Sequence, residues 1–149
     1  MKNKINGFSL IELLVVVAIL GTIAAIGIVS YDGYVSSTKM KSAENIMRQI
    51  GLGQSEYYSL NGEYFGGTGA CTPSAATSSD VQDAVLEGSK AIVDDDDIST
   101  SGYFICVQQD TLAKYKIIAQ VADDTTGQAQ SGKCKMEVDG LGSLSKTNC

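Results

Sequence analysis

The sequence contains no histidine, no tryptophan and a single proline among its 149 residues. Without histidine, Ser/His/Asp and Cys/His catalysis, imidazole metal sites and the usual side-chain pH switch are excluded. Basic residues are also few, because 11 lysines and arginines stand against 17 acidic residues, for a formal net charge of −6. This balance opposes general binding to nucleic acid or to an anionic membrane surface through a cationic face.

What the chain does have is one long hydrophobic run. Residues 13–29 read LLVVVAILGTIAAIGIV without a charge, and extending the run back to Phe8 adds only Ser9 and Glu12 as polar side chains. As a helix, residues 8–29 would be about 33 Å long, which matches a hydrocarbon core of roughly 30 Å. Lys2 and Lys4 precede the run. The sequence therefore predicts a single membrane span with a cytoplasmic N-terminus and an exported remainder.

The short motif before this run is distinctive. A secretory signal is cut after its apolar stretch, whereas here Gly7 stands in front of it. The sequence GFSLIE at residues 7–12, after a short basic leader and before a long apolar helix, closely resembles the type IV pilin family, which shares this N-terminus with type II secretion pseudopilins.

The resemblance implies a role for each residue of the motif. Residues 1–7 would be a leader peptide that a prepilin peptidase removes after Gly7, and the same enzyme would methylate the new amino group of Phe8. The precursor would sit in the bacterial inner membrane, and the pilus assembly machinery would then pack it into an extracellular homo-oligomeric filament. No cofactor, metal or direct nucleic-acid contact is expected, and no enzymatic activity.

Glu12 is the unusual residue of the apolar run. A carboxylate there costs roughly 2.5 to 3.5 kcal/mol on insertion scales, so it needs a partner or a proton, and before cleavage we expect none nearby. Cleavage after Gly7 would place the Phe8 amine one helical turn away. Glu12 could then pair with its own N-terminus. The resemblance implies instead that in a filament it pairs with the Phe8 amine of a neighbouring subunit.

The expected head domain covers residues 30–149. Residues 30–60 carry an apolar stripe at spacings of three and four, broken only by Gln54, which predicts an amphipathic helix that packs on a core. The stripe consists of Ala43, Ile46, Met47, Ile50, Gln54, Tyr57 and Tyr58. Type IV pilins commonly carry a proline where this chain has Val29, so a proline kink is not expected. Gly21, Gly27 and Gly33 could still soften the helix.

A loop region is expected at residues 61–101, which are rich in Gly, Ser, Thr, Ala and Asp. It could hold a short helix at residues 80–87, capped by Asp80. The four acids at residues 94–97 suggest a calcium site by their oxygen content, but consecutive side chains point in different directions, and a solvated acidic loop is the better interpretation.

The last third has the composition of a β-sheet. Residues 102–108, 114–121 and 133–138 are rich in β-branched and aromatic side chains, and residues 144–147 add a short fourth strand. Short links predict an antiparallel sheet with the helix across one face. The expected fold class is therefore α+β, a long N-terminal helix whose apolar half protrudes and whose second half packs on a small sheet, and this is also the fold of pilins.

The four cysteines, Cys71, Cys106, Cys134 and Cys149, all lie in the part expected to be exported, where disulfides persist. Three pairings are possible, and four free thiols are a further alternative. We choose Cys71 with Cys106 and Cys134 with Cys149, because the second pair resembles the C-terminal disulfide loop of many type IV pilins. The first would tie the loop region to the first strand.

Two functions remain compatible with the sequence. The first is a structural subunit of a type IV pilus, in which the filament carries adhesion, twitching motility or DNA uptake. The alternative is a type II secretion pseudopilin, and pseudopilins usually lack the C-terminal disulfide loop. An exported, membrane-anchored enzyme or receptor has no nucleophile–base pair or metal cluster to support it.

Overall fold

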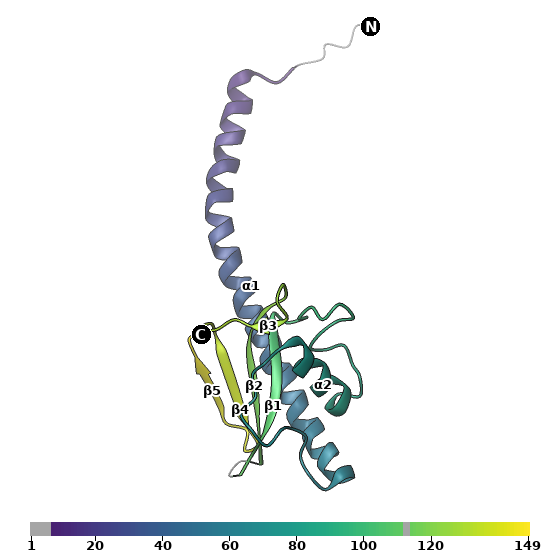
Figure 1. The fold of residues 1–149 in the computed structure, drawn as a ribbon. Helices are drawn as coiled ribbons and strands as arrows, with labels where there is room; N and C mark the ends of the chain where they lie inside the picture. The colour runs from purple at the N-terminus through teal and green to yellow at the C-terminus, as the bar shows by residue number, and fades with distance from the viewer. Residues whose placement is uncertain (1–6, 112–113) are drawn as a thin grey trace. The chain divides into compact units, whose positions relative to one another are not determined.

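The computed structural model describes residues 7–111 and 114–149, and side chains at positions 28–30 are not described (Figure 1). Leader residues 1–6, with Lys2 and Lys4, lie outside the described part. The element order is α1 (Leu10–Asn61), α2 (Ala75–Val85), β1 (Tyr103–Asp110), β2 (Lys114–Asp123), β3 (Gln128–Ala129), β4 (Lys135–Asp139) and β5 (Leu144–Thr147). The chain divides into two compact units, residues 1–37 and residues 38–149.

In the first unit, α1 is an uninterrupted helix, and no break occurs at Gly21, Gly27 or Gly33. The absence of proline explains this continuity, since no ring removes an intrahelical hydrogen bond there. The part of α1 in this unit, residues 10–37, is about 42 Å long at the α-helical rise. Its apolar part is long enough to cross a membrane by length and composition.

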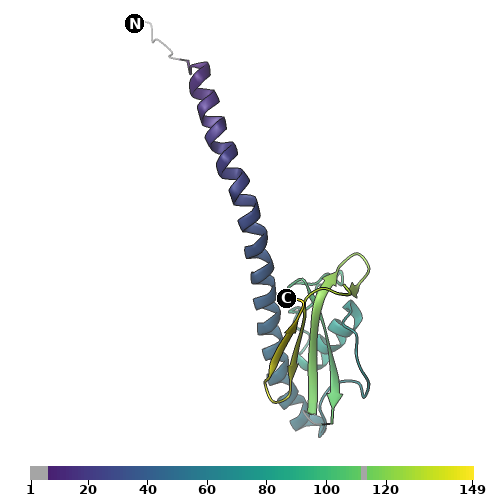
Figure 2. The same cartoon turned by 90° about the vertical axis from the view of Figure 1, so that its left-hand side faces the viewer.

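The second unit, which we call the head, has the predicted α+β fold. The strand order is β1-β2-β4-β5, all neighbours are antiparallel, and the two-residue β3 pairs with the far end of β2. Residues 38–61 of α1 lie along one face of this sheet, as the turned view shows (Figure 2). The predicted long helix on a small antiparallel sheet is confirmed for this unit.

The helical stripe and the sheet form one hydrophobic core. Ala43, Met47 and Ile50 are fully buried on α1, and Ile46 is 7% exposed. They share the core with alternating residues of the central strands, among them Ile105, Ile117, Ala119 and Met136. The period of the stripe in the sequence therefore identified the face of α1 that is buried. It was wrong at its C-terminal end, because Tyr58 is 46% exposed.

Gln54, the polar break in the stripe, is completely buried. Its Nε2 atom donates to the Phe65 carbonyl at 3.0 Å, and its Oε1 atom accepts from the Phe65 amide at 2.9 Å. The side chain thus satisfies both polar groups of one backbone residue, as a neighbouring strand would. Gln54 fastens the segment after α1 onto the helix.

The helix in the loop region differs from the prediction. It spans Ala75–Val85 instead of residues 80–87, and its N-cap is Ser74, not Asp80. The Ser74 hydroxyl accepts from the Thr77 amide at 3.2 Å, and the Thr77 hydroxyl accepts from the Ser74 amide at 2.9 Å. This reciprocal box uses Thr in place of the usual Glu or Gln, so the familiar start signal is missing from the sequence.

Helix α2 lies along the outer edge of β1. The Ser78 hydroxyl accepts from the Ile105 amide at 2.8 Å, and the Thr77 hydroxyl donates to the Ile105 carbonyl at 3.1 Å. Side chains of α2 therefore take the place of a further strand at this edge, where unpaired backbone groups would otherwise remain.

Candidate functional site

The segment that the motif singles out is exposed over its whole apolar length. Phe8 is 81% exposed, and a Cβ at Gly7 would meet no atom within 4 Å. The large apolar side chains of residues 10–26 are between 47% and 81% exposed; they are Leu10, Ile11, Leu13, Leu14, Val15, Val16, Val17, Ile19, Leu20, Ile23 and Ile26. Such a surface is far larger than soluble monomers expose, so it is built to contact lipid or other protein.

The Glu12 carboxylate has a hydrogen-bond partner in the uncleaved chain. The expectation that no partner lies near it before cleavage was therefore wrong. The Glu12 Oε2 atom accepts from the Ser9 amide at 2.9 Å and from the Ser9 hydroxyl at 2.8 Å. In return, the Glu12 amide donates to the Ser9 hydroxyl at 3.3 Å. Ser9 precedes α1 and Glu12 is its third residue, so the two form a capping box at the helix start.

Ser9 is thus a residue of this site, although from the sequence it was interpreted only as a polar interruption of the apolar run. The signal was present, because Ser-Leu-Ile-Glu has the S-x-x-E spacing of a capping box before an apolar run. The box uses only Oε2 of Glu12, and among the described residues no group bonds to Oε1. The carboxylate can accept a further donor there.

Beyond the apolar run, several tyrosines and acids are also exposed. Tyr31 is 67% and Tyr34 is 69% exposed. In the head, the acids at residues 94–97 are exposed, and Asp94 Oδ1 accepts from the Asp96 and Ile98 amides at 3.0 and 2.9 Å. Asp94 therefore closes a turn, and the described residues contain no cluster suited to a metal ion.

Two disulfides fasten the head, Cys71–Cys106 and Cys134–Cys149, with Cα–Cα distances of 6.2 and 4.4 Å. This is the pairing chosen from the sequence. The first joins the segment before α2 to β1, and the second joins the segment before β4 to the residues after β5. Loop closure over 35 and 15 residues contributes roughly 4 and 3 kcal/mol by a chain-entropy estimate.

An ion pair between a buried carboxylate and a partly exposed ammonium links the last strand to α1. Glu44, 7% exposed on α1, bonds to the ammonium group of Lys146 on β5 and lies 3.1 Å from that of Lys41. The hydrogen bond from Lys146 holds the pKa of the Glu44 carboxyl below its usual value, although burial acts in the opposite direction. Burial raises the pKa of Tyr103, and the nearby Glu44 charge adds to the effect.

Comparison with known proteins agrees with this description. Residues 2–28 match the family model of the prokaryotic N-terminal methylation motif. The chain is 42% identical over 62 residues to the fimbrial protein EcpC of Eikenella corrodens, covering 42% of this chain and 40% of the relative. It is 33% identical over 77 residues to a fimbrial protein of Neisseria meningitidis serogroup B (strain ATCC BAA-335 / MC58), covering 52% and 44%.

The chain therefore spans less than half the length of these curated relatives. No solved structure matches it at a significant level. The methylation motif and the two fimbrial relatives confirm the resemblance to the type IV pilin family. Both relatives are named as fimbrial proteins, and the matched motif lies on the helix that is long and apolar enough to cross a membrane.

Proposed function

We propose that this chain is the structural subunit of a type IV pilus and polymerises through its apolar helix. The observation that carries the proposal is the combination of the methylation motif at residues 2–28 with an apolar surface that the chain leaves exposed along the same helix. Full burial of one Val, Leu, Ile or Phe side chain is worth about 1.5 to 3 kcal/mol. Packing of this segment against other copies would therefore supply a large driving force once the subunit leaves the membrane.

The proposed life cycle follows the domain order. The precursor spans the bacterial inner membrane through residues 8–29, with its N-terminus in the cytoplasm. Prepilin peptidase removes residues 1–7 after Gly7 and methylates Phe8, and the pilus assembly machinery inserts the subunit into the filament. The expected head domain, residues 30–149, then lies on the outside of the extracellular pilus, and the filament serves adhesion, twitching motility or DNA uptake.

Glu12 acts at the assembly step. In the capping box its Oε1 atom has no donor among the described residues, and the cationic Phe8 amine of a neighbouring subunit would supply one. A charged pair inside an apolar filament core is only stable when both partners are present. The pair would therefore set the axial register between subunits as well as neutralise two buried charges.

The test is to shear surface filaments from cells that express the chain and to measure the intact mass of their main component. We expect this chain without residues 1–7 and with one added methyl group. Loss of Lys2 and Lys4 leaves 9 basic against 17 acidic residues, so the mature net charge would be −8. A mature protein that still begins at Met1, or that is cut after Ala24 or Ala25, would contradict the proposal.

The alternative, a pseudopilin of a type II secretion system, has the same processing and is separated by a second measurement. Deletion of a pilin abolishes surface filaments and leaves protein secretion intact. If deletion instead stops the release of secreted enzymes while surface filaments persist, the pseudopilin function is correct.

A further inference from the structure

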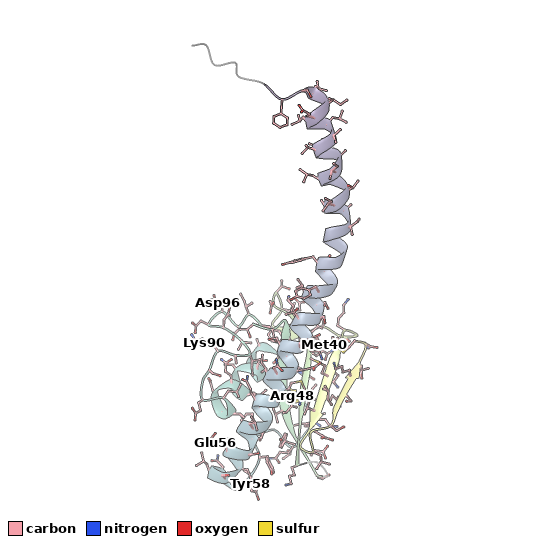
Figure 3. The ribbon with its side chains drawn as sticks, turned by 180° about the vertical axis from the view of Figure 1, so that it is seen from behind. Met40, Arg48, Glu56, Tyr58, Lys90 and Asp96 are labelled. Atoms are coloured by element: carbon pink, nitrogen blue, oxygen red, sulfur yellow. A yellow bond between two sulfur atoms is a disulfide. The ribbon has the colours of Figure 1, made fainter. Side chains whose placement is uncertain are left out.

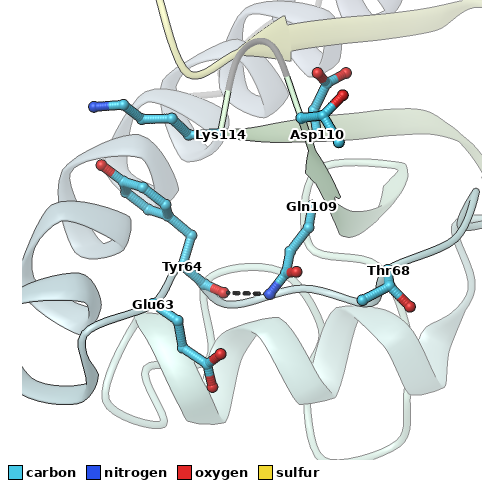
Figure 4. Close-up of a pocket in the computed structure, with 7 residues that line it drawn as sticks. Glu63, Tyr64, Thr68, Gln109, Asp110 and Lys114 are labelled. Carbon is cyan, nitrogen blue, oxygen red and sulfur yellow. Dashed lines mark hydrogen bonds between the residues drawn. The ribbon is translucent and has the colours of Figure 1, made fainter.

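A cavity of about 340 Å³ lies at the end of the head where α1 ends (Figure 4). The segment after α1, the end of β1 and the start of β2 form its walls. The described side chains that line it include Glu63, Tyr64, Thr68, Gln109, Asp110 and Lys114. Its volume falls within the range of small-molecule sites.

The aromatic wall of this cavity is held in place by its neighbours. The Tyr64 ring stacks on Tyr58, with centroids 4.6 Å apart, and packs against Tyr115 at 5.1 Å. The Tyr64 carbonyl accepts a hydrogen bond from Gln109 Nε2 at 3.1 Å, which links the segment after α1 to β1. A ligand would therefore meet a preformed wall and would pay little to order it.

The cavity carries both acceptors and donors of hydrogen bonds. Glu63 is an exposed carboxylate without a hydrogen bond or ion pair to any described residue. Because Gln109 bonds through Nε2, its Oε1 atom is left as an acceptor that no described donor occupies. Asp110 adds a second carboxylate, which lies 4.0 Å from the Lys116 ammonium. The donors include the hydroxyls of Tyr64, Thr68 and Thr111 and the ammonium of Lys114, 5.7 Å from the Tyr64 ring centroid.

This chemistry selects among ligand classes. Two carboxylates repel an anion. A purely apolar ligand would desolvate the polar walls without replacing their hydrogen bonds to water. A cationic ligand would compete with Lys114, which already occupies the region over the Tyr64 ring. A neutral polyhydroxyl ligand fits best, since its hydroxyls donate to the carboxylates and to Gln109 and its C–H groups contact the tyrosine ring.

From this geometry we propose that the cavity between Tyr64 and Gln109 binds an uncharged saccharide. An open site of this size with few hydrogen bonds binds one ligand weakly. Multivalent binding rests on the proposed function, because in a filament each subunit would present one copy of the cavity. A surface that carries many saccharides would then be held by many weak contacts at once, which raises the overall affinity without a new contact.

The experiment compares wild type with a cavity variant, Glu63→Ala/Lys114→Met, and a matched control, Glu56→Ala/Lys133→Met. Glu56 and Lys133 are exposed and lie outside the cavity, and Glu56 is seen on the outer face of α1 in Figure 3. Sheared filaments of each are applied to immobilised neutral oligosaccharides of hexose and N-acetylhexosamine, and to sialylated and sulfated ones. We expect wild type and control to be retained on some neutral saccharides, and the cavity variant at least tenfold less.

A second measurement separates this proposal from the filament proposal. The detergent-solubilised full-length chain is mixed with the neutral oligosaccharides that retain filaments, or with the whole neutral panel if no filaments form, and saturation transfer to the sugar protons is measured by NMR. Transfer to the sugar from wild type and control that is lost with the cavity variant supports the site even without filaments. No transfer from wild type, equal transfer from all three proteins, or binding confined to the sialylated and sulfated saccharides would overturn it.

Discussion

At the scale of single residues, Glu12 provides the sharpest test of assembly. Glu12→Gln keeps nearly the same volume and keeps an oxygen that can accept from Ser9, but it removes the charge that would pair with the Phe8 amine. We expect insertion into the membrane to be as good or better and leader cleavage to be normal. Filament assembly should fail, because the neighbouring amine would be buried without a counter-charge at a cost of several kcal/mol.

The matched control is Ser9→Ala, which removes the hydroxyl of the capping box and leaves the carboxylate. Loss of an N-cap costs about 1 kcal/mol of helix stability, so this variant should still form filaments. Processed protein in membranes and sheared filaments are scored separately for both variants. Normal filament yield with Glu12→Gln would show that its charge is dispensable, and pairing with its own N-terminus would then be the better interpretation.

Glu44 makes the stability of the head depend on pH. Its pKa is lowered in the folded state, chiefly by Lys146, so its contribution is complete above the unfolded pKa of about 4.3. The contribution is lost as the pH falls through the lower folded value. Lys146→Met should therefore reduce the free energy of unfolding at pH 7 by about 1 kcal/mol, the worth of one hydrogen bond, because Lys41 still pairs with the Glu44 carboxylate.

Thermal unfolding of the full chain in detergent, followed by circular dichroism at pH 7 and pH 3, measures this effect. The difference between wild type and Lys146→Met should be smaller at pH 3, because the contribution of a carboxyl with a lowered pKa declines once the pH is below the unfolded pKa. Lys133→Met removes an exposed lysine and should not change thermal unfolding appreciably at either pH. An equal loss at both pH values would mean that Lys146 stabilises the head through its alkyl chain and not through the Glu44 charge.

At the scale of elements, substitutions at two glycines of α1 separate the effect of close packing on stability from the effect of helix propensity. A Cβ at Gly53 would lie 2.4 Å from the Val85 carbonyl oxygen, so α1 and α2 approach each other where no side chain fits. At Gly51 the nearest atom, the Tyr115 hydroxyl, is 3.6 Å away, which is ordinary contact. Gly53→Ala should destabilise the head by about 1 to 3 kcal/mol, whereas Gly51→Ala should stabilise it by up to about 1 kcal/mol.

Chemical unfolding of the two variants side by side gives the comparison, because both substitutions add the same methyl group to the same helix two residues apart. If Gly53→Ala were as stable as Gly51→Ala, the ends of α1 and α2 would have to separate without cost. The close approach of the two helices would then contribute nothing to the head.

Elements with a strong hydrophobic periodicity could be predicted from the sequence. Elements defined by single hydrogen bonds could not. The stripe at Ala43, Met47 and Ile50 indicated the buried face of α1, and four of the five strands were placed within a few residues. The start of α2 was missed because Ser74 and Thr77 form their box with two hydroxyls. The two-residue β3 carries no period at all, and pairs only because β2 extends beside it.

The candidate site divides in the same way. Gly7, Phe8 and Glu12 lie within the motif, and their roles in processing and assembly stay predictions. Ser9 could have been identified by its S-x-x-E spacing. The Glu44–Lys146 pair and the walls of the saccharide cavity could not, because their members come from distant parts of the chain. Tyr64 and Gln109 are 45 residues apart, and no local pattern relates them.

At the scale of the whole molecule, processing and head stability should be separable. Cys149→Ser opens the Cys134–Cys149 disulfide, which closes a 15-residue loop worth roughly 3 kcal/mol. We expect a less stable head and a lower pilus yield, whereas leader cleavage at Gly7 should be unaffected. Immunoblots of cleaved and uncleaved protein, together with sheared filaments, measure the two effects. Impaired cleavage in this variant would show that the peptidase senses the state of the head.

The Glu44–Lys146 pair can form only late in the synthesis of the chain. Lys146 follows Glu44 by 102 residues, and at 5 to 20 residues per second the ribosome needs roughly 5 to 20 s to make that stretch. During this interval the Glu44 carboxylate has Lys41 beside it but lacks the Lys146 ammonium of the finished head. The contact between β5 and α1 is therefore among the last of the head to become possible, because its two segments leave the ribosome that far apart in time.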